Sequence, residues 1–194
     1  MKKNAKKLLK KIFIMISKLL IPLFYKKDFL QGRWFDDSIV GWKLAWKCIW
    51  WQKVHGFNRK IPWPVSPKIT ISNPENILFH PDDINNFQGF GNYYQCFSAK
   101  IIIGKGSYIA PNVGIITANH DPLNLDKHLP GKDVVIGEKC WIGMNAVILP
   151  GVVLGPRTIV GAGSVVTKSF PEGNCIIAGN PARLIRKLGE KIES

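Results

Sequence analysis

Asn119, His120 and Asp121 are three adjacent polar residues in a stretch that is otherwise apolar and rich in glycine. A free imidazole titrates near pH ~6.5, so its neutral form is a base at neutral pH. A base within hydrogen-bond reach makes a hydroxyl nucleophilic and contributes roughly 10²–10⁴ to the rate. His120 is therefore a candidate general base, with the Asp121 carboxylate or a backbone carbonyl as the group that orients its ring. A surface histidine in a turn is the alternative.

The chain around this trio repeats every six residues. Apolar residues recur at that spacing, and each is usually followed by Gly. The apolar positions are Ile103, Ile109, Ile115, Ile136, Ile142, Ile148, Leu154, Val160 and Val166. A six-residue repeat is typical of a β-helix, in which short strands and turns stack coil upon coil. Repeated Gly and Pro without a 3.6-residue period argue against a long α-helix.

A small or modest side chain lies four places after each apolar residue, and we expect both positions to point into a narrow prism. The glycines are expected to form the turns between faces, because Gly accepts a positive φ at low cost. The repeat is interrupted once, between Ile115 and Ile136, and the interruption contains the polar trio. Asn119 falls on a small position, which predicts an inward side chain that shapes the loop by hydrogen bonds.

The net charge of +14 is concentrated at the N-terminus, where residues 1–27 hold nine Lys and no acid. Leu8, Ile12, Met15, Leu19 and Leu23 recur at three- and four-residue steps between these lysines, which predicts a cationic amphipathic helix over 2–25. Such a helix suits the surface of an anionic membrane, so we expect peripheral association through residues 2–26. It is too charged to span a bilayer convincingly. Packing on its own domain or on a partner subunit is the alternative, and no small-residue cleavage site marks a signal peptide.

Residues 28–67 form a second segment that is rich in tryptophan. Trp42, Trp46 and Trp50 would share one face of a helix at roughly 38–54, as core residues or as interfacial anchors. The proline-rich stretch 61–67 predicts an extended linker.

Residues 68–194 form the third segment, which is predicted to be the β-helix domain. Residues 68–100 would make a first irregular coil that covers its N-terminal edge. A short helix from about 181 to 189 would close the domain, with Asn180 as its N-cap and Pro181 at its first position.

Other function classes receive little support. No recognition helix, zinc finger or stacking-aromatic motif accompanies the basic charge, so nucleic acid is not an expected partner. The four cysteines are widely spaced and form no metal pattern, which indicates reduced thiols in a cytoplasmic protein. A zinc hydratase would need three converging histidines, and the sequence provides no such trio, so no metal is expected.

The runs IIIGKGSYIAPNVGIITANHDP and VVIGEKCWIGMNAVILPGVVLGPRTIVGAGSVVTKSFPEGNCIIAGNPARLIRKL resemble the hexapeptide-repeat acyltransferases. The resemblance covers about residues 89–188 and is greatest to the maltose and galactoside O-acetyltransferase-like group, together with predicted acetyltransferases of polysaccharide biosynthesis. It implies a left-handed parallel β-helix, a homotrimer, and acetyl-CoA bound between neighbouring subunits. The expected fold is therefore all-β, with N-terminal amphipathic helices and a short C-terminal helix.

The resemblance also implies roles for individual residues. His120 matches the histidine that takes the proton of the acceptor hydroxyl. The positions that match the CoA site are Trp141, Gly143, Asn145, Ala162 and Gly163 along the pantetheine arm, and Lys168, Arg183 and Arg186 at the phosphates. The acceptor side would include Tyr93, Tyr94 and Gln95. The chain departs from the maltose and galactoside pattern at Gln95-Cys96, where that group has Asn, which argues against a simple soluble sugar.

The expected activity is acetyl-CoA-dependent O-acetylation of a saccharide, namely a cell-surface polysaccharide or its lipid-linked precursor. Transfer to the nitrogen of an amino sugar, or to a small alcohol such as serine, is the alternative within enzymes. A non-catalytic β-helix that acts as a scaffold or binding module is the alternative of another class. The basic N-terminus places the expected enzyme in the cytoplasm at the inner face of the cell membrane.

Overall fold

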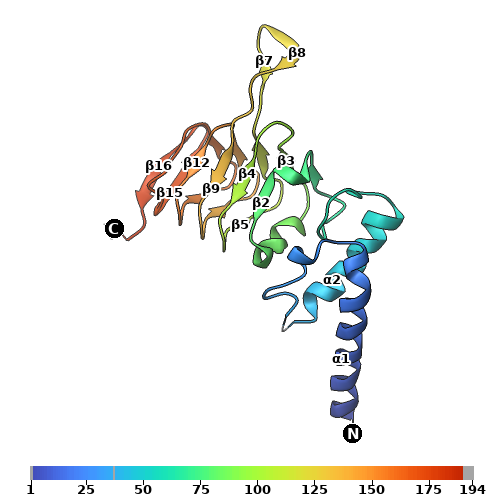
Figure 1. The fold of residues 1–194 in the computed structure, drawn as a ribbon. Helices are drawn as coiled ribbons and strands as arrows, with labels where there is room; N and C mark the ends of the chain where they lie inside the picture. Colours follow the sequence, from blue (N-terminus) through green and yellow to red (C-terminus); the bar gives the residue numbers. More distant parts are fainter. Residues whose placement is uncertain (1, 37, 190–194) are drawn as a thin grey trace. The chain divides into compact units, whose positions relative to one another are not determined.

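The computed structural model describes residues 2–36 and 38–189, so Met1, Asp37 and residues 190–194 of the predicted segments lie outside it. The chain divides into two compact units, Met1–Pro67 and Lys68–Ser194. The first unit is helical and the second consists mainly of short strands, as Figure 1 shows. The expected description as all-β is therefore too narrow, because it holds only for the second unit.

The first unit is built on two helices, α1 (Lys2–Leu20) and α2 (Val40–Ile49). Short 3₁₀ turns follow α1 at Ile21–Leu23 and Lys27–Phe29, and a π-helical turn, Trp50–Val54, extends α2. Within the described residues, no helix is both long enough and apolar enough to cross a membrane.

A hydrogen-bond chain joins α1 to α2. The Trp46 indole N–H donates to the Ser17 hydroxyl over 2.9 Å, and that hydroxyl donates to the carbonyl oxygen of Phe13 over 2.7 Å. Ser17 is fully buried, so its polar group is satisfied on both sides. The second half of α1 is thus held against α2.

A buried glutamine connects the remaining parts of the first unit. The Gln52 Oε1 atom accepts from the Tyr25 hydroxyl over 2.8 Å and from the backbone N–H of Val65 over 3.0 Å. Its Nε2 atom donates to the carbonyl of Trp63 over 3.2 Å. Residues 61–67 contain neither helix nor strand, and the Gln52 amide group ties this segment to the helices.

The predicted tryptophan stripe on α2 is core at one end only. Trp42 is buried against Phe35, with ring centroids 5.1 Å apart, and donates to the Phe35 carbonyl over 2.8 Å. Trp46 is half-buried through its contact with α1. Trp50, by contrast, is 55% exposed. The core interpretation therefore holds for the first two rings.

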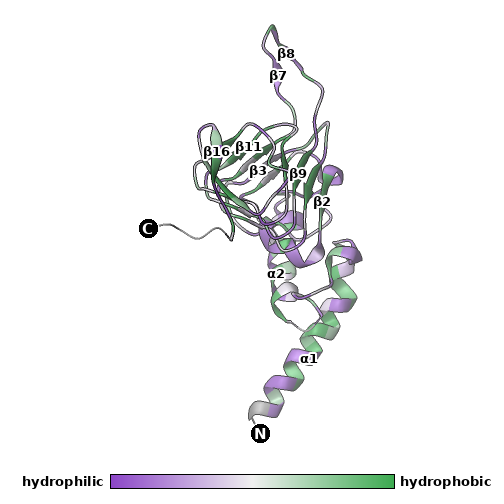
Figure 2. Cartoon of the chain, turned by 90° about the vertical axis from the view of Figure 1, so that its left-hand side faces the viewer, coloured by the Kyte–Doolittle hydropathy of each residue, from purple (hydrophilic) through white to green (hydrophobic). Residues whose placement is uncertain are grey.

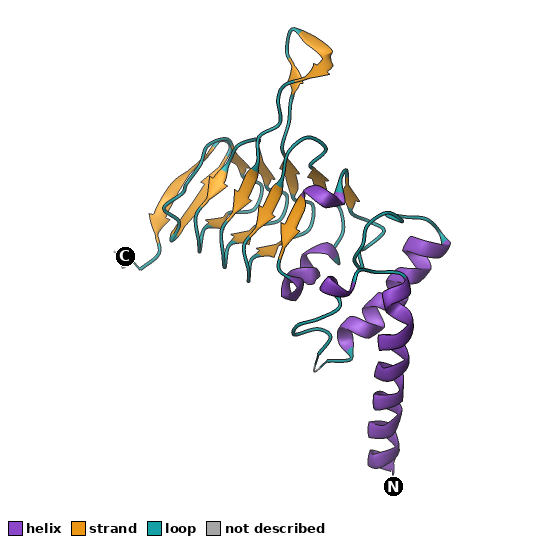
Figure 3. Ribbon diagram, in the orientation of Figure 1, coloured by secondary structure: helices purple, strands orange, loops and turns teal. Residues whose placement is uncertain are grey.

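The second unit is a prism with three sheets, whose strands succeed one another around each coil (Figure 3). The first sheet consists of β1 (Thr70–Ile71), β3 (Tyr93–Gln95), β6 (Gly114–Ile116), β11 (Val147–Ile148) and β14 (Val165–Val166). The second consists of β2 (Ile77–Phe79), β4 (Ile101–Ile103), β9 (Val134–Ile136) and β12 (Val153–Leu154). The third consists of β5 (Tyr108–Ile109), β10 (Trp141–Ile142), β13 (Ile159–Val160), β15 (Cys175–Gly179) and β16 (Ala182–Lys187). All neighbours are parallel except β15 and β16. These parallel sheets fit a left-handed β-helix.

The core of the prism follows the six-residue repeat. Every apolar position named above is buried, and Figure 2 shows the apolar character of the strands. The small residues four places later are also buried; they are Ser107, Val113, Cys140, Ala146, Val152, Thr158 and Ser164. All four cysteines are free and buried, and desolvation raises the pKa of the Cys48 thiol to about 12. The predicted inward positions are therefore confirmed.

The role predicted for the repeat glycines is wrong. A positive φ occurs three places after the apolar residue, not one place after it. The residues at that position are Gly106, Asn112, Lys139, Asn145, Gly151, Arg157 and Gly163. The glycine directly after the apolar residue serves close approach instead. A Cβ atom on Gly137 would lie 2.7 Å from the carbonyl carbon of Gly155 in the next coil.

The irregular first coil covers the N-terminal end of the prism, as repeat arrays require. Its 3₁₀ segment Pro81–Phe87 contains the buried Asn86. The Asn86 side chain accepts from the backbone N–H of Ile109 over 3.0 Å and donates to the carbonyl of Ser107 over 2.9 Å. The third sheet has no further strand beyond β5 at this edge, and the Asn86 amide supplies hydrogen bonds that such a strand would make.

The predicted C-terminal helix is a β-strand. Residues 180–181 form a turn, and β16 then runs antiparallel to β15, pairing Ala182 with Gly179 and Lys187 with Cys175. An isolated helix of nine residues is marginal in water, because few backbone bonds offset its nucleation cost. The exposed edge of β15 offers a full set of backbone partners. Tertiary pairing therefore outweighs the capping signal at Asn180 and Pro181.

Candidate active site

The polar trio lies in a loop that projects from the corner between the first and second sheets (Figure 1). Its tip is a small antiparallel ribbon made of β7 (His120–Asp121) and β8 (Asn124–His128). The backbone N–H of Lys132 donates to the carbonyl of Thr117 over 2.8 Å and closes the loop at its base. The repeat resumes in register after the loop, because Ile136 of β9 pairs with Ile103 of β4.

The His120 ring is held by its own loop. Its Nδ1 atom lies 2.7 Å from the carbonyl oxygen of Leu125. A carbonyl oxygen can only accept, so Nδ1 carries the proton and donates. In the neutral ring, the lone pair then belongs to Nε2. His120 is exposed, so Nε2 is a base available to an external hydroxyl.

The neighbours of His120 do not orient its ring. The Asp121 carboxylate accepts from the backbone N–H of Leu123 over 2.8 Å and stabilises the turn of the ribbon. Asn119 is exposed, which corrects the prediction of an inward side chain, because the chain leaves the prism before reaching that position. Its carbonyl accepts from the backbone N–H of Leu129 over 2.8 Å. Both residues thus shape the loop around the base.

His128 and Phe97 form a stack behind the His120 ring. The His120 and His128 ring centroids are 4.1 Å apart, at an interplanar angle of 38°. His128 in turn meets Phe97 edge-on, with centroids 4.9 Å apart. The stack restricts the rotation of His120 and fixes the direction of Nε2. Neither His128 nor Phe97 was predicted to hold the His120 ring.

Two of the three predicted acceptor residues are buried, Tyr94 inside the prism and Gln95 against the base of the loop. Tyr94 has no exposed surface, and its hydroxyl donates to the carbonyl of Asn86 over 3.2 Å. Burial raises the pKa of this phenol well above its ordinary value. Gln95 is also buried, so neither side chain can contact an acceptor. Tyr93, which is 44% exposed, stays a candidate.

Gln95 instead anchors the base of the loop that carries His120. Its Oε1 atom accepts from the backbone N–H groups of Thr117, over 2.9 Å, and Ala118, over 3.0 Å. Its Nε2 atom donates to the carbonyl of Ala118 over 2.9 Å. Ala118 lies two residues before His120, so this amide fixes the point at which the loop leaves the prism.

Replacing Gln95 by Leu is expected to destabilise the second unit by about 2–4 kcal/mol. The change leaves the N–H and carbonyl of the buried Ala118 without partners, at roughly 1–3 kcal/mol each. Thermal unfolding should show the loss, and activity should fall with it because the loop loses its anchor. The control is Gln31→Leu, which removes one exposed hydrogen bond and should change stability by less than about 0.5 kcal/mol. Equal stability of the two variants would contradict the anchoring role.

The outer face of the third sheet carries a row of large side chains in register. Tyr108 pairs with Trp141, Trp141 with Ile159, Ile159 with Ile176, and Ile176 with Arg186. Trp141 is 56% exposed. The row therefore forms an apolar strip that ends in a guanidinium group.

A line of small residues runs beside this row, two residues further along each coil. Its members are Ala110, Gly143, Gly161 and Ala178. Ala178 pairs with Arg183, and Ile176 pairs with Arg186. The register shift at Ile176/Ile177 thus places the two arginines opposite alternate residues of β15. Directly paired residues share a face, so both guanidinium groups lie on the outer side. An extended thin ligand with a phosphate at one end would match this arrangement.

The other predicted CoA residues lie at two corners of the prism. Asn145, Ala162 and Gly163 are exposed on successive coils at the corner between the third and first sheets, and the Gly163 N–H donates to the Met144 carbonyl over 2.8 Å. Lys168 follows β14 at a different corner, and its ammonium lies 5.6 Å from the centre of the Phe170 ring. A single chain therefore does not bring Lys168 onto the face that carries the two arginines.

His120 and the third sheet lie on opposite sides of the prism. The loop leaves at the corner between the first and second sheets, and in a triangular coil that corner faces away from the third sheet. The Trp141 row and His120 of the same chain therefore face different directions. Among the described residues, no group of three or more His, Cys, Asp or Glu is placed to hold a metal ion.

Comparison with known proteins decides the family. The family described as "Bacterial transferase hexapeptide (six repeats)" matches residues 133–168. A Dictyostelium discoideum protein described as a candidate acetyltransferase is 38% identical over 159 residues, which cover 73% of this chain and 83% of that protein. The chain belongs to the hexapeptide-repeat acetyltransferases.

Further members share shorter stretches or the fold. The galactoside O-acetyltransferase of Escherichia coli K12 is 36% identical over 110 residues, covering 52% of this chain and 53% of that protein. The structure of a maltose O-acetyltransferase from Clostridium difficile 630 superposes with a TM-score of 0.52 at 27% identity, covering 94% of this chain and 89% of that one. The chain spans about half the length of several curated relatives that it matches. The likeness to the maltose O-acetyltransferase structure therefore extends well beyond residues 133–168.

Proposed function

We propose that this hexapeptide-repeat acetyltransferase transfers the acetyl group of acetyl-CoA to a hydroxyl of a saccharide. One observation carries the proposal: the Leu125 carbonyl fixes the His120 proton on Nδ1 and leaves Nε2 as an exposed base. A hydroxyl bound at Nε2 would have the acceptor that it needs to become a nucleophile.

The reaction follows from that geometry. Nε2 takes the proton of the acceptor hydroxyl as its oxygen attacks the thioester carbonyl. The tetrahedral intermediate then collapses, the C–S bond breaks, and the CoA sulfur leaves with the proton that His120 returns. The products are an acetyl ester and free CoA thiol. The neutral ring is restored, so the His128 stack need not move during the cycle.

The acetyl-CoA is proposed to lie on the third sheet of a neighbouring subunit. The line of small residues would admit the pantetheine arm beside Trp141, and Arg183 and Arg186 would meet the phosphates. His120 lies on the opposite side of its own prism, so the base and the bound thioester would come from different chains. This separation supports the homotrimer, in which each site combines the loop of one subunit with the third sheet of the next.

The acceptor is proposed to be a cell-surface polysaccharide or its lipid-linked precursor. Gln95 anchors the loop where the maltose and galactoside group has a different residue, so the acceptor side is not built as in that group. The exposed Tyr93 and the open surroundings of His120 would accommodate a chain of sugars. The proposed location is the cytoplasm at the inner face of the cell membrane, where such precursors are assembled from lipid carriers.

The test is release of CoA thiol from acetyl-CoA with a panel of oligosaccharide acceptors, followed by mass measurement of the product. We expect thiol release to depend on the acceptor and to yield an ester that mild base removes. A product stable to mild base would indicate an amide and overturn O-transfer. Failure of acetyl-CoA to bind in a direct binding assay would overturn the enzyme assignment and favour a scaffold.

A further inference from the structure

Helix α1 presents two apolar faces, and only one of them has a partner within the first unit. The inner face meets α2 through Ser17 and the half-buried Phe13. The outer face consists of Leu8, Ile12, Met15 and Leu19 on α1, continued by Leu23 in the turn that follows. We call these five residues the outer stripe. Leu8, Met15 and Leu19 are 60%, 65% and 74% exposed.

The two sequence-based alternatives for this helix therefore concern different faces. The inner face packs on its own unit, and the outer stripe is left for another surface. Figure 2 shows apolar and polar residues alternating along α1. Five large apolar side chains in one continuous line exceed what scattered surface residues produce and mark an interaction site.

The charge around the outer stripe is of one sign. Lys7, Lys10, Lys11 and Lys18 are all exposed on the same helix. Residues 1–67 contain fifteen Lys or Arg and three Asp, whereas residues 68–194 contain twelve and ten Asp or Glu. Nearly all the excess positive charge thus belongs to the unit that carries the stripe. Lysine stems can lie along an apolar surface while their ammonium groups reach a negative layer above it.

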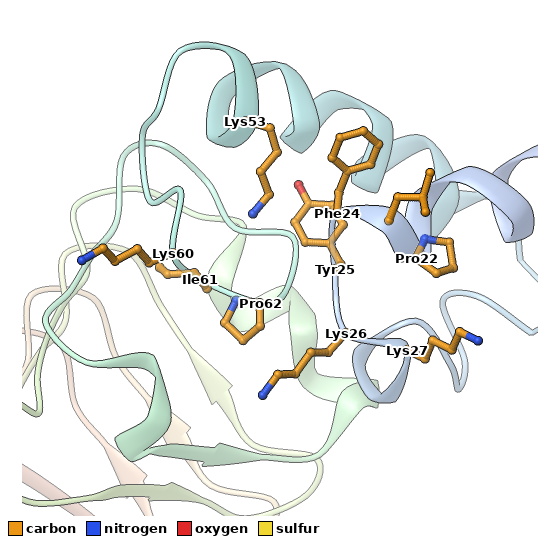
Figure 4. Close-up of a pocket in the computed structure, with 10 residues that line it drawn as sticks. Pro22, Phe24, Tyr25, Lys26, Lys27, Lys53, Lys60, Ile61 and Pro62 are labelled. Atoms are coloured by element: carbon orange, nitrogen blue, oxygen red, sulfur yellow. The ribbon is translucent and has the colours of Figure 1, made fainter.

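A basic hollow lies at the end of the outer stripe. It has a volume of about 400 Å³ and is lined by Pro22, Leu23, Phe24, Tyr25, Lys26, Lys27, Lys53, Lys60, Ile61 and Pro62. Figure 4 shows Lys26, Lys53 and Lys60 at the margins of this space, with the ammonium group of Lys53 beside Tyr25 and that of Lys60 pointing outward. Leu23 and Phe24 are 75% and 39% exposed, so apolar and cationic groups meet at the same place.

The surroundings of Lys53 favour the binding of an anion in this hollow. Its ammonium donates to the carbonyl of Arg59 over 2.8 Å and lies 5.1 Å from the centre of the Tyr25 ring. Burial, and secondly the charge of Arg59, lowers the pKa of this amine. An anion in the hollow would offset both effects. A phosphate group is an anion that lysines bind as point charges.

We propose that the first unit binds the surface of an anionic phospholipid bilayer. The outer stripe lies in the plane of the interface and enters the boundary between headgroups and acyl chains. The lysine hollow takes the phosphate of one headgroup, and the remaining lysines face the negative leaflet. This inference goes beyond the acetyl transfer proposed above and does not rest on it, because it concerns residues 1–67 alone.

Charge selects the lipid surface over a second copy of the chain. Two copies paired through the outer stripe would bring two sets of lysines together, and like charges oppose that contact. An anionic leaflet supplies both the apolar layer and the opposite charge. Leu23 belongs both to the outer stripe and to the lining of the hollow, so the two features adjoin.

The test is sedimentation of the full chain with vesicles of phosphatidylcholine alone and of an equal mixture of phosphatidylcholine and phosphatidylglycerol. We expect binding to the mixed vesicles only. Leu8→Glu with Leu19→Glu should weaken it by roughly tenfold or more for each leucine lost. Lys26→Gln with Lys60→Gln should weaken it about fivefold per lysine.

Matched controls separate these surfaces from general effects. Leu123→Glu with Leu125→Glu makes the same change at leucines that are 96% and 70% exposed in the second unit, and should bind as the wild type does. Lys43→Gln with Lys47→Gln removes the same charge from exposed positions outside the hollow and should cost less than the hollow pair. Circular dichroism verifies that each variant keeps its helices.

Three results would overturn the proposal. Unchanged binding by the Leu8 and Leu19 variant would show that the outer stripe does not contact the bilayer. An equal loss of vesicle affinity from the Lys26 and Lys60 variant and from the Lys43 and Lys47 variant would show that the hollow is not a specific headgroup site. Absence of vesicle binding, together with self-association that the Leu8 and Leu19 variant abolishes, would show that a second copy covers the stripe.

Discussion

Replacing His120 by Ala is expected to lower kcat/KM for acetyl transfer by roughly 10²–10⁴ while leaving the affinity for acetyl-CoA unchanged. The variant loses the Nε2 base, and the proposed thioester site on the third sheet contains no part of the loop. Thiol release measures the rate, and calorimetric titration of CoA measures the affinity. Retained activity with normal CoA binding would refute the assignment of His120.

The stacked pair of imidazoles supplies a sharper control. His128→Phe keeps a ring against both His120 and Phe97 but removes the second candidate base. We expect this variant to keep most of the activity, because the Leu125 carbonyl still orients His120. If His128→Phe were inactive and His120→Ala active, the base would be His128. The β7–β8 ribbon would then serve to position His128.

Replacing Gly137 by Ala is expected to destabilise the prism by about 3 kcal/mol. The added methyl group would lie 2.7 Å from both the carbonyl carbon of Gly155 and the backbone nitrogen of Pro156. Backbone cannot rotate away as a side chain can, so two coils must separate. Chemical denaturation measures the effect, with the midpoint shifting and the slope unchanged if folding stays two-state.

Gly89→Ala is the matched control for that experiment. Its added methyl group would meet no atom within 4 Å, and its φ is not positive. The substitution should be neutral or stabilising by up to about 1 kcal/mol, because Ala has less freedom to lose on folding. Similar effects at Gly137 and Gly89 would show that the coils of the prism are packed less closely than the structure indicates.

The prism could be predicted from the sequence because one rule applies to every coil. Each hexad must bury an apolar residue and a small residue, and the Ile142 and Ala146 pair shows that the spacing alone reveals both. The role of Gly137 was not predicted correctly. The sequence does not distinguish a glycine that permits close approach of two coils from one that permits a left-handed backbone. Lys139 and Arg157 adopt the left-handed conformation, which their residue types do not suggest.

The candidate site could be located but not assembled from the sequence. His120 was found because it interrupts the repeat, whereas the carbonyl that orients it belongs to Leu125, a residue whose side chain carries no signal. Tyr94 was misplaced because alternation along β3 turns it into the prism, and Gln95 was misplaced because the base of the loop covers it. The C-terminal strand was missed because its partner, β15, supplies the deciding hydrogen bonds only in three dimensions.

The loop that carries His120 enters and leaves the prism at one corner, and the coils on either side stay in register across it. Ile115 and Ile136 are 21 residues apart, and the regular step is six. Doubling the length of such a loop costs only about 0.6 kcal/mol in closure entropy. Natural selection can therefore lengthen or exchange this segment while the rest of the domain is inherited unchanged. Grafting the loop of one relative onto the prism of another is, by the same reasoning, a practical way to exchange the residues around His120.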